Sequence, residues 1–280
     1  MTGLVHYHHP DDEQYSLAYV TLDHDEIEPE DGKVETYQLE ETVHVLYTNS
    51  GASGTVDDIT EDFEAILDEM DESDRLVTVR ILQTFEGVLE ATELEEGEEL
   101  EIYKQIDVGR IPAALEHVDW SRSVVEVAGQ LMSSLILAHP LPNANHRTSI
   151  AFAEWYLESA EPSFSLPKLA TESYDWQEWV DTYIADSKRL LTVRRNTTPF
   201  RLLDEWGCEI VLRKGGIEIE LSEYDLERPQ SEALSTYATH HTELCTEFMI
   251  ESVTRAGASH LRFENGVDKQ EFLKYLESSE

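Results

Sequence analysis

Two helical patterns on either side of one short segment constrain the fold of this chain most strongly. Residues 121–138 and 147–157 both place apolar side chains at helical spacing, which predicts two amphipathic helices. Their apolar faces consist of Val124, Val125, Ala128, Leu131, Leu135 and Ala138 in the first pattern, and of Ile150, Phe152, Ala153 and Tyr156 in the second. The chain must turn between them, so the residues of the connecting loop are expected to converge on one small volume.

That loop, His-Pro-Leu-Pro-Asn-Ala-Asn-His-Arg-Thr from His139 to Thr148, carries residue types suited to chemistry. The N-terminus of the second helix favours an anion, and the planar fork of Arg147 fits phosphate oxygens. A histidine, with an ordinary pKa of about 6.5, can accept a proton from a hydroxyl. Transfer of a phosphoryl or nucleotidyl group to a hydroxyl requires a base beside an anion site, because that reaction depends mainly on positioning and charge stabilisation.

The loop resembles the signature of the Fic/Doc proteins, His-Pro-Phe-x-(Asp/Glu/Asn)-(Gly/Ala)-Asn-(Gly/Lys)-Arg-Thr. Leu141 stands where the signature has Phe, and His146 where it has Gly or Lys. The matching positions are His139, Pro140, Asn143, Ala144, Asn145, Arg147 and Thr148. The resemblance covers about residues 57–195 and implies a mainly α fold with a Fic/Doc-like helical core.

The resemblance also implies roles for the loop residues. His139 falls where the family has the general base that deprotonates a hydroxyl of a target protein. The nucleotide phosphates would be held by Asn143, Ala144, Asn145, His146 and Arg147. ATP would be the substrate, with Mg²⁺. Asn143 occupies the place of the acidic Mg²⁺ ligand, and its neutral carbonyl lacks the charge that this cation prefers.

Several alternatives stay open at this point. Adenylylating members carry a second arginine three places after the first, where this chain has Ile150, and the loop is closer to the Doc branch, which transfers a phosphate. The transferred group is therefore AMP or phosphate. Asn143 also allows a degenerate member that only binds a nucleotide or a protein. A purely architectural loop, with His139 capping one helix, is the third reading.

Partners follow from the same resemblance: a target protein with a modified hydroxyl, and an antitoxin or a second copy of the chain. Fic proteins are often restrained by a helix with Ser/Thr-x-x-x-Glu-Gly/Asn. Thr92-x-x-x-Glu96-Gly97 fits this pattern, but its acidic surroundings predict a loop. His6-x-His8-His9 is expected to be a flexible terminal segment rather than a metal site.

The charge of the chain constrains its surroundings. It has 59 acidic and 20 basic residues and a net charge of −39, yet 40% of it is hydrophobic, which is enough for a core. An acidic surface of this kind predicts a halophilic protein, because concentrated salt screens self-repulsion. It disfavours binding to nucleic acid, which requires a basic face. The basic residues between Lys188 and Arg201 are expected to form salt bridges with their acidic surroundings.

Two distant cysteines, Cys208 and Cys245, without metal-ligand spacing favour a reducing compartment. No apolar run approaches the roughly 18 residues of a membrane span, and the N-terminus lacks a signal-peptide pattern. We therefore expect a cytoplasmic protein without a membrane partner.

The pattern divides the chain into three parts. Residues 1–56 alternate apolar and polar positions and form a β-rich N-terminal segment. Residues 57–199 form the Fic/Doc-like helical domain, in which residues 100–111 are expected to form a hairpin. Residues 200–280 form a smaller α+β accessory domain, with a hairpin around Gly215-Gly216 and two helices.

Overall fold

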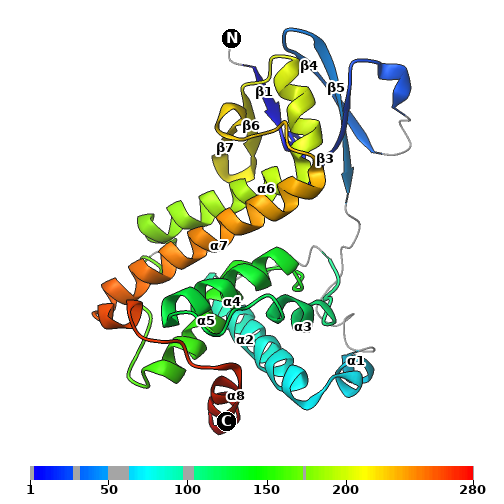
Figure 1. Ribbon diagram of the computed structural model, residues 1–280. Coiled ribbons are helices and arrows are strands. Elements are labelled where there is room, and N and C mark those ends of the chain that lie inside the picture. The colour runs from blue at the N-terminus through cyan, green and yellow to red at the C-terminus, as the bar shows by residue number, and fades with distance from the viewer. Residues whose placement is uncertain (1–2, 28–31, 50–62, 97–103, 173–174, 280) are drawn as a thin grey trace. The chain divides into compact units, whose positions relative to one another are not determined.

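The computed structural model describes residues 3–27, 32–49, 63–96, 104–172 and 175–279. Its contacts define two compact units, each drawn from segments that are distant in the sequence (Figure 1). The first unit combines residues 1–51 with 185–239, and the second combines residues 52–184 with 240–280. These units differ from the three sequential parts 1–56, 57–199 and 200–280. The expected fold class, mainly α with a β-rich N-terminal segment, is confirmed.

The first unit contains two sheets. The four-stranded antiparallel sheet has the order β2-β3-β5-β4, and the three-stranded sheet has the order β1-β6-β7. The strands are β1 (Leu4–His6), β2 (His8–His9), β3 (Asp12–Thr21), β4 (Lys33–Gln38), β5 (Thr42–Asn49), β6 (Ile210–Arg213) and β7 (Ile217–Glu220). Strand β1 pairs in parallel with β6, so the start of the chain joins a hairpin about 200 residues later.

The expected hairpin around Gly215 and Gly216 is confirmed. Both glycines have positive φ, 73° and 72°, which a residue with a side chain adopts only at a cost. They connect β6 and β7, whose inward side chains Val211 and Ile219 are fully buried. The alternation read in the sequence thus places one face of this hairpin in the core.

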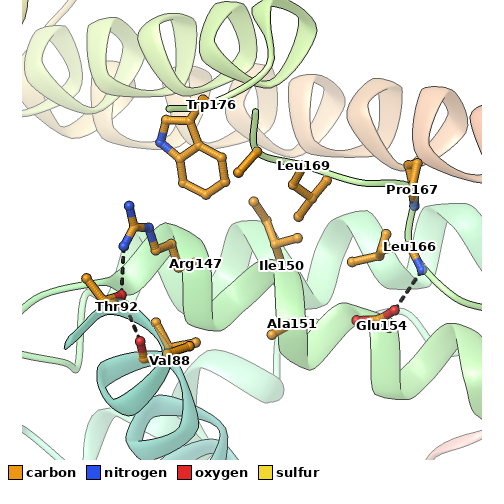
Figure 2. A pocket seen from close by; sticks show the side chains of 12 residues that line it. Val88, Thr92, Arg147, Ile150, Ala151, Glu154, Leu166, Pro167, Leu169 and Trp176 are labelled. Carbon is orange, nitrogen blue, oxygen red and sulfur yellow. Dashed lines mark hydrogen bonds between the residues drawn. The ribbon is translucent and has the colours of Figure 1, made fainter. Parts of the chain in front are cut away.

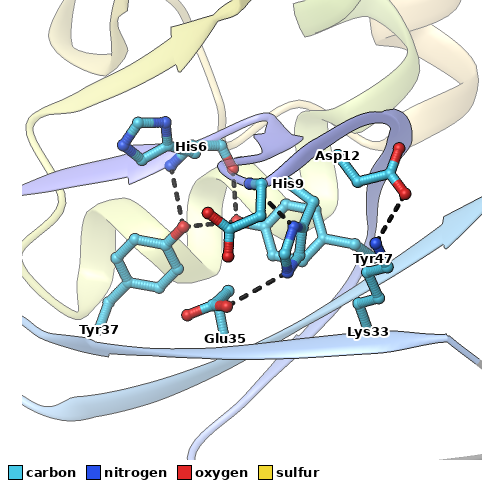
Figure 3. Close-up of polar contacts among 8 residues, drawn as sticks. His6, His9, Asp12, Lys33, Glu35, Tyr37 and Tyr47 are labelled. Carbon is cyan, nitrogen blue, oxygen red and sulfur yellow. Dashed lines mark hydrogen bonds and ion pairs between the residues drawn. The ribbon is translucent and has the colours of Figure 1, made fainter.

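The N-terminal histidines are ordered, so the expectation of a flexible terminus is wrong. His9 is buried, and its Nε2 lies 3.2 Å from Oε1 of Glu35 (Figure 3). The hydroxyl of Tyr47 donates to the carbonyl of His6 at 2.7 Å and lies 2.7 Å from the hydroxyl of Tyr37. Burial raises the pKa of Tyr47 well above its ordinary value. Strand pairing with distant partners, which the local sequence does not reveal, fixes this segment.

The second unit is helical. Its helices are α1 (Phe63–Glu69), α2 (Glu72–Glu96), α3 (Arg110–Leu115), α4 (Val124–Ala138), α5 (Asn145–Ala160) and α8 (Lys269–Ser278). Helices α6 (Glu178–Glu205) and α7 (Gln230–Arg255) contribute residues to both units. Short 3₁₀ helices occur at His24–Glu26, Lys214–Gly216, Leu221–Glu223 and Ser259–Arg262. No helix in these described ranges is both long and apolar enough to cross a membrane.

Helices α4 and α5 correspond to the two patterns that constrain the fold. Their apolar positions are buried, including Leu131, Ile150 and Phe152, except for the half-buried Ala138 at the end of α4. Helix α4 begins with a capping box, in which Ser123 caps the first turn and the carboxylate of Glu126 accepts from the N–H of Ser123 at 3.0 Å. The helix–loop–helix predicted from the sequence is therefore present.

Two local predictions are wrong. Residues 110 and 111, the end of the expected hairpin, begin helix α3, because Ile111, Ala114 and Leu115 bury one face at helical spacing. Residues 100–103 of that hairpin lie outside the described residues. Thr92 lies in the last turns of α2 rather than in a loop. Its hydroxyl donates to the carbonyl of Val88 at 2.8 Å, as serine and threonine do inside helices.

Candidate functional site

The loop between α4 and α5 begins and ends with a left-handed residue. His139, directly after α4, has φ 50° and ψ 54°, and Ala144, directly before α5, has φ 52° and ψ 20°. Outside glycine this backbone conformation costs on the order of 1–2 kcal/mol. Glycine would avoid the cost at both positions. Residues held in such conformations mark places where other requirements override local preference, and these concentrate at functional sites.

Asn145 holds the loop closed from inside. Its side chain is 5% exposed. Its Oδ1 accepts from the N–H of Leu141 at 3.1 Å, and its Nδ2 donates to the carbonyl of Leu141 at 2.9 Å and to that of Asn143 at 3.4 Å. The sequence predicted that this amide binds the nucleotide phosphates. In the structure it forms hydrogen bonds with the backbone of its own loop.

Asn143 is also engaged locally. Its Oδ1 accepts from the N–H of Ala144 at 2.6 Å. Among the described residues, no three His, Cys, Asp or Glu side chains gather in a way that could hold a metal ion. Mg²⁺ is usually bound through carboxylates together with substrate phosphates.

Two cationic side chains that the motif does not include hold the loop from outside. The Nζ of Lys104 donates to the carbonyl of His139, and Arg110 Nη1 donates to the carbonyl of Ala138 at 3.3 Å. The N–H of Asp107 donates to the carbonyl of Pro140 at 2.8 Å. The segment before α3 thus fixes the end of α4, where Lys and Arg complement the partial negative charge of a helix C-terminus. Their sequence distance from the motif gave no signal for this role.

Arg147, the motif arginine, extends along α5 toward α2 and Trp176 (Figure 2). Its Nη1 donates to the hydroxyl of Thr92 at 2.7 Å. Its guanidinium carbon lies 5.2 Å from the centroid of the Trp176 ring, within cation–π range. The residue that the sequence assigned to phosphate binding is therefore positioned by a hydroxyl and an aromatic ring.

Arg147 also lines a cavity of about 300 Å³. Its walls are mainly apolar and come from α2, from α5 and from the chain that follows α5: Val88, Ala91, Thr92, Arg147, Ile150, Ala151, Glu154, Leu166, Pro167, Leu169, Ala170 and Trp176. Figure 2 shows Arg147 and Glu154 at opposite ends, with Ile150 between them. Small-molecule sites combine such apolar walls with a few placed polar groups.

Glu154 is the acidic group of this cavity. Burial raises its pKa above the ordinary value of a glutamate, and the nearby Glu158 acts in the same direction. The N–H of Leu166, which donates to Glu154 Oε1 at 2.7 Å, opposes the rise. A carboxyl group with a raised pKa in a cavity is a candidate functional group. The motif did not include it, although its i+7 spacing from Arg147 places both on one helix face.

His146 and Thr148 complete the loop. The ring of His146 lies 6.4 Å, centroid to centroid, from that of Tyr183 in an edge-on arrangement. The hydroxyl of Thr148 is buried and finds no hydrogen-bond partner within the described ranges. The loop thus brings His139, Asn143, Ala144, Asn145, His146 and Arg147 into one short segment. The side chains of these residues contact different partners. Asn143 and Asn145 bond to the loop backbone, whereas Arg147 contacts Thr92 and Trp176.

The model of one protein family, DUF8172, described as a family of unknown function, matches residues 1–280. The chain belongs to this family. None of the curated proteins and none of the solved structures matches it. The resemblance to Fic/Doc proteins therefore depends on the loop residues and on the helices around them.

Proposed function

We propose that this chain is a Fic/Doc-like transferase that moves AMP or a phosphate from ATP to a hydroxyl of a target protein. One observation carries the proposal. Arg147, the anion-binding residue of the loop, also lines a mainly apolar cavity large enough for part of a small molecule. The nucleoside would occupy the cavity, and the phosphates would lie between Arg147 and the N-terminus of α5.

The chemistry requires a base and a leaving group. His139 would accept the proton of the target hydroxyl while its oxygen bonds to phosphorus. The bond to the leaving group breaks at the same centre, releasing pyrophosphate if AMP is transferred or ADP if phosphate is transferred. The helix N-terminus and Arg147 would stabilise the charge that develops on the phosphate oxygens. The proton then leaves His139 to solvent.

The contact between Arg147 and Thr92 supports a restrained resting state. Thr92 lies on α2, and its hydroxyl accepts from Nη1, one of the donors that would face a phosphate. Thr92-x-x-x-Glu96 lies on a helix, as the restraining pattern of the family requires. A nucleotide would therefore compete with this hydroxyl for Arg147.

The second candidate is a family member that binds a nucleotide or a protein without transfer. It is favoured by the amides of Asn143 and Asn145, which are bonded to the backbone of their own loop. The neutral side chain of Asn143, in place of an acidic Mg²⁺ ligand, also favours this second candidate. In either case we place the activity in a cytoplasm with concentrated salt, where ATP is available and the net charge of −39 is screened.

A labelling experiment separates these candidates. The full chain is incubated in molar KCl with Mg²⁺, a host lysate and ATP labelled at the α- or the γ-phosphate. Label from the α position on a protein indicates nucleotidylation, and label from the γ position indicates phosphorylation. His139→Ala should abolish transfer, while the matched control His117→Ala, an exposed histidine of the same unit, should retain it.

Each other outcome has a defined meaning. Transfer that persists in His139→Ala contradicts the assignment of the base. An ATP-dependent rise in Tm without transfer supports the binding protein. The loss of both effects indicates that the loop is only architectural. An antitoxin or a second copy of the chain would be identified by its co-purification with the inactive His139→Ala variant.

A further inference from the structure

Among the described residues, three arginines of the first unit lack the carboxylate partner that their neighbours have. Arg194 is one of them and donates from Nε to the carbonyl of Leu234 at 2.9 Å; the other two are Arg195 and Arg213. Arg189, Arg201 and Arg228 pair with Asp186, Glu205 and Asp225 at 2.5, 3.8 and 2.8 Å. Among the described residues, no carboxylate lies within 4 Å of Arg195 or Arg213. In a chain with 59 acidic and 20 basic residues, these two positions need an explanation.

Arg213, at the end of β6, is half-buried among neutral groups. Its Nη1 donates to the carbonyl of Lys188 at 3.0 Å, and its guanidinium lies 5.6 Å from the centroid of the Tyr7 ring. Its Nε is buried, with no hydrogen-bond partner among the described residues. Burial lowers the pKa of Arg213, and the charge of Arg195 lowers it further. The guanidinium is therefore incompletely compensated by the protein.

Further positive charges act on the same groups: Arg195 on Arg213, and Lys214 together with Arg213 on His8. Lys214 follows Arg213 and is exposed, and Arg195 on α6 is exposed as well. The Nδ1 of His8 lies 3.2 Å from the hydroxyl of Ser16, and its Nε2 is buried and has no hydrogen-bond partner in the part of the chain that the structure describes. Burial, followed by the charges of Arg213 and Lys214, lowers the pKa of His8 to about 4. No carboxylate side chain of the described residues contributes to either pKa shift.

Clustered and partly buried like charges destabilise a fold unless an anion offsets them. Arginine forks match the oxygens of phosphate, and lysine adds a point charge. We propose that Arg195, Arg213 and Lys214 bind a phosphate-type oxyanion, either free phosphate or the phosphate of a small organic molecule. A nucleic acid is excluded as the source, because a long polyanion is repelled by a net charge of −39.

This site is independent of the proposed transfer, since its residues and those of the α4–α5 loop belong to different units. It is tested by calorimetric titration of the full chain with inorganic phosphate and with AMP, at pH 7 and fixed KCl. We expect one saturable site for phosphate. Arg195→Gln and Lys214→Gln should each weaken binding about tenfold, as the loss of a charge-assisted hydrogen bond predicts.

The controls use matched residues. Arg228→Gln removes the same charge from an arginine that has a carboxylate partner, and binding should stay within about twofold because its charge is already offset. Arg195→Lys keeps the charge and should retain most of the affinity. Binding of phosphate should also raise the pKa of His8 in a proton NMR titration. Because Lys214 is exposed at a turn, its variant should fold even if Arg195→Gln does not.

The outcomes separate the sources and can overturn the proposal. Equal affinities for phosphate and AMP indicate that free phosphate suffices, and tighter binding of AMP that Arg195→Gln weakens indicates an organic phosphate. The proposal fails if phosphate gives no saturable heat. It also fails if Arg228→Gln weakens binding as much as Lys214→Gln does.

Discussion

Replacement of Asn145 by alanine tests whether this amide supports the loop or serves a ligand. The side chain is 5% exposed and bonds both the N–H and the carbonyl of Leu141, a residue that is itself 2% exposed. Alanine would leave both backbone groups buried without these partners. A buried polar group that loses its partner costs about 1–3 kcal/mol, so the two together should lower the free energy of unfolding by about 2–4 kcal/mol.

Asn143→Ala is the matched control. It removes one hydrogen bond, from the N–H of Ala144, at a half-buried position next to the start of a helix, where water can replace the lost acceptor. Its expected cost is about 1 kcal/mol. Comparing two asparagine-to-alanine changes in the same loop cancels the effect of the substitution itself.

Urea unfolding in molar KCl, followed by tryptophan fluorescence, measures both variants. Of the five tryptophans, Trp120, Trp155, Trp176 and Trp179 belong to the unit that contains the loop, so the signal reports mainly on this unit. If Asn145→Ala costs no more than Asn143→Ala, the supporting role is refuted. An unchanged stability together with lost ATP binding would instead identify Asn145 as a ligand.

Three further predictions concern stability. Gly129→Ala should lower the free energy of unfolding by about 1–3 kcal/mol in urea titrations, because the added Cβ would lie 2.6 Å from Cα of Thr246. Ser123→Ala should cost about 1 kcal/mol at neutral pH by removing the capping box. The loss of stability caused by Ser123→Ala should become smaller in urea titrations at lower pH. Ser123 lowers the pKa of Glu126, so protonation of Glu126 removes the stabilisation that Ser123 provides. His8 binds its proton more readily in the unfolded chain, so stability is lost as pH falls from about 6.5 to about 4. His8→Gln should reduce this loss in melting curves recorded across that range, and an unchanged pH dependence would contradict the burial of the imidazole.

Local patterns were sufficient for much of the fold. The helical spacing of residues 121–138 and 147–157 placed α4 and α5, and the pair Gly215-Gly216 placed the β6–β7 hairpin. Where local signals competed, the prediction failed. Residues 110–115 are helical because three of them reach the core, and Thr92 lies in a helix despite its acidic surroundings.

The candidate site shows the same division. The sequence placed His139 and Arg147 on either side of one loop, since the order of residues fixes what a short loop contains. It gave no signal for Lys104 and Arg110, which hold the loop, or for Trp176, which lines the cavity next to it. These residues come from segments that are brought together only by packing.

By itself, the sequence determined the two helices, the residues of their connecting loop and the acidic character of the chain. The tertiary structure decided the partners of each side chain. In the folded chain Asn145 forms hydrogen bonds with the backbone of its own loop, and Arg147 contacts Thr92 and Trp176. Arg213 lies over the ring of Tyr7. The reason is physical: periodicity depends on neighbours within a few residues, whereas a hydrogen bond forms with whatever group the folded chain brings to about 3 Å.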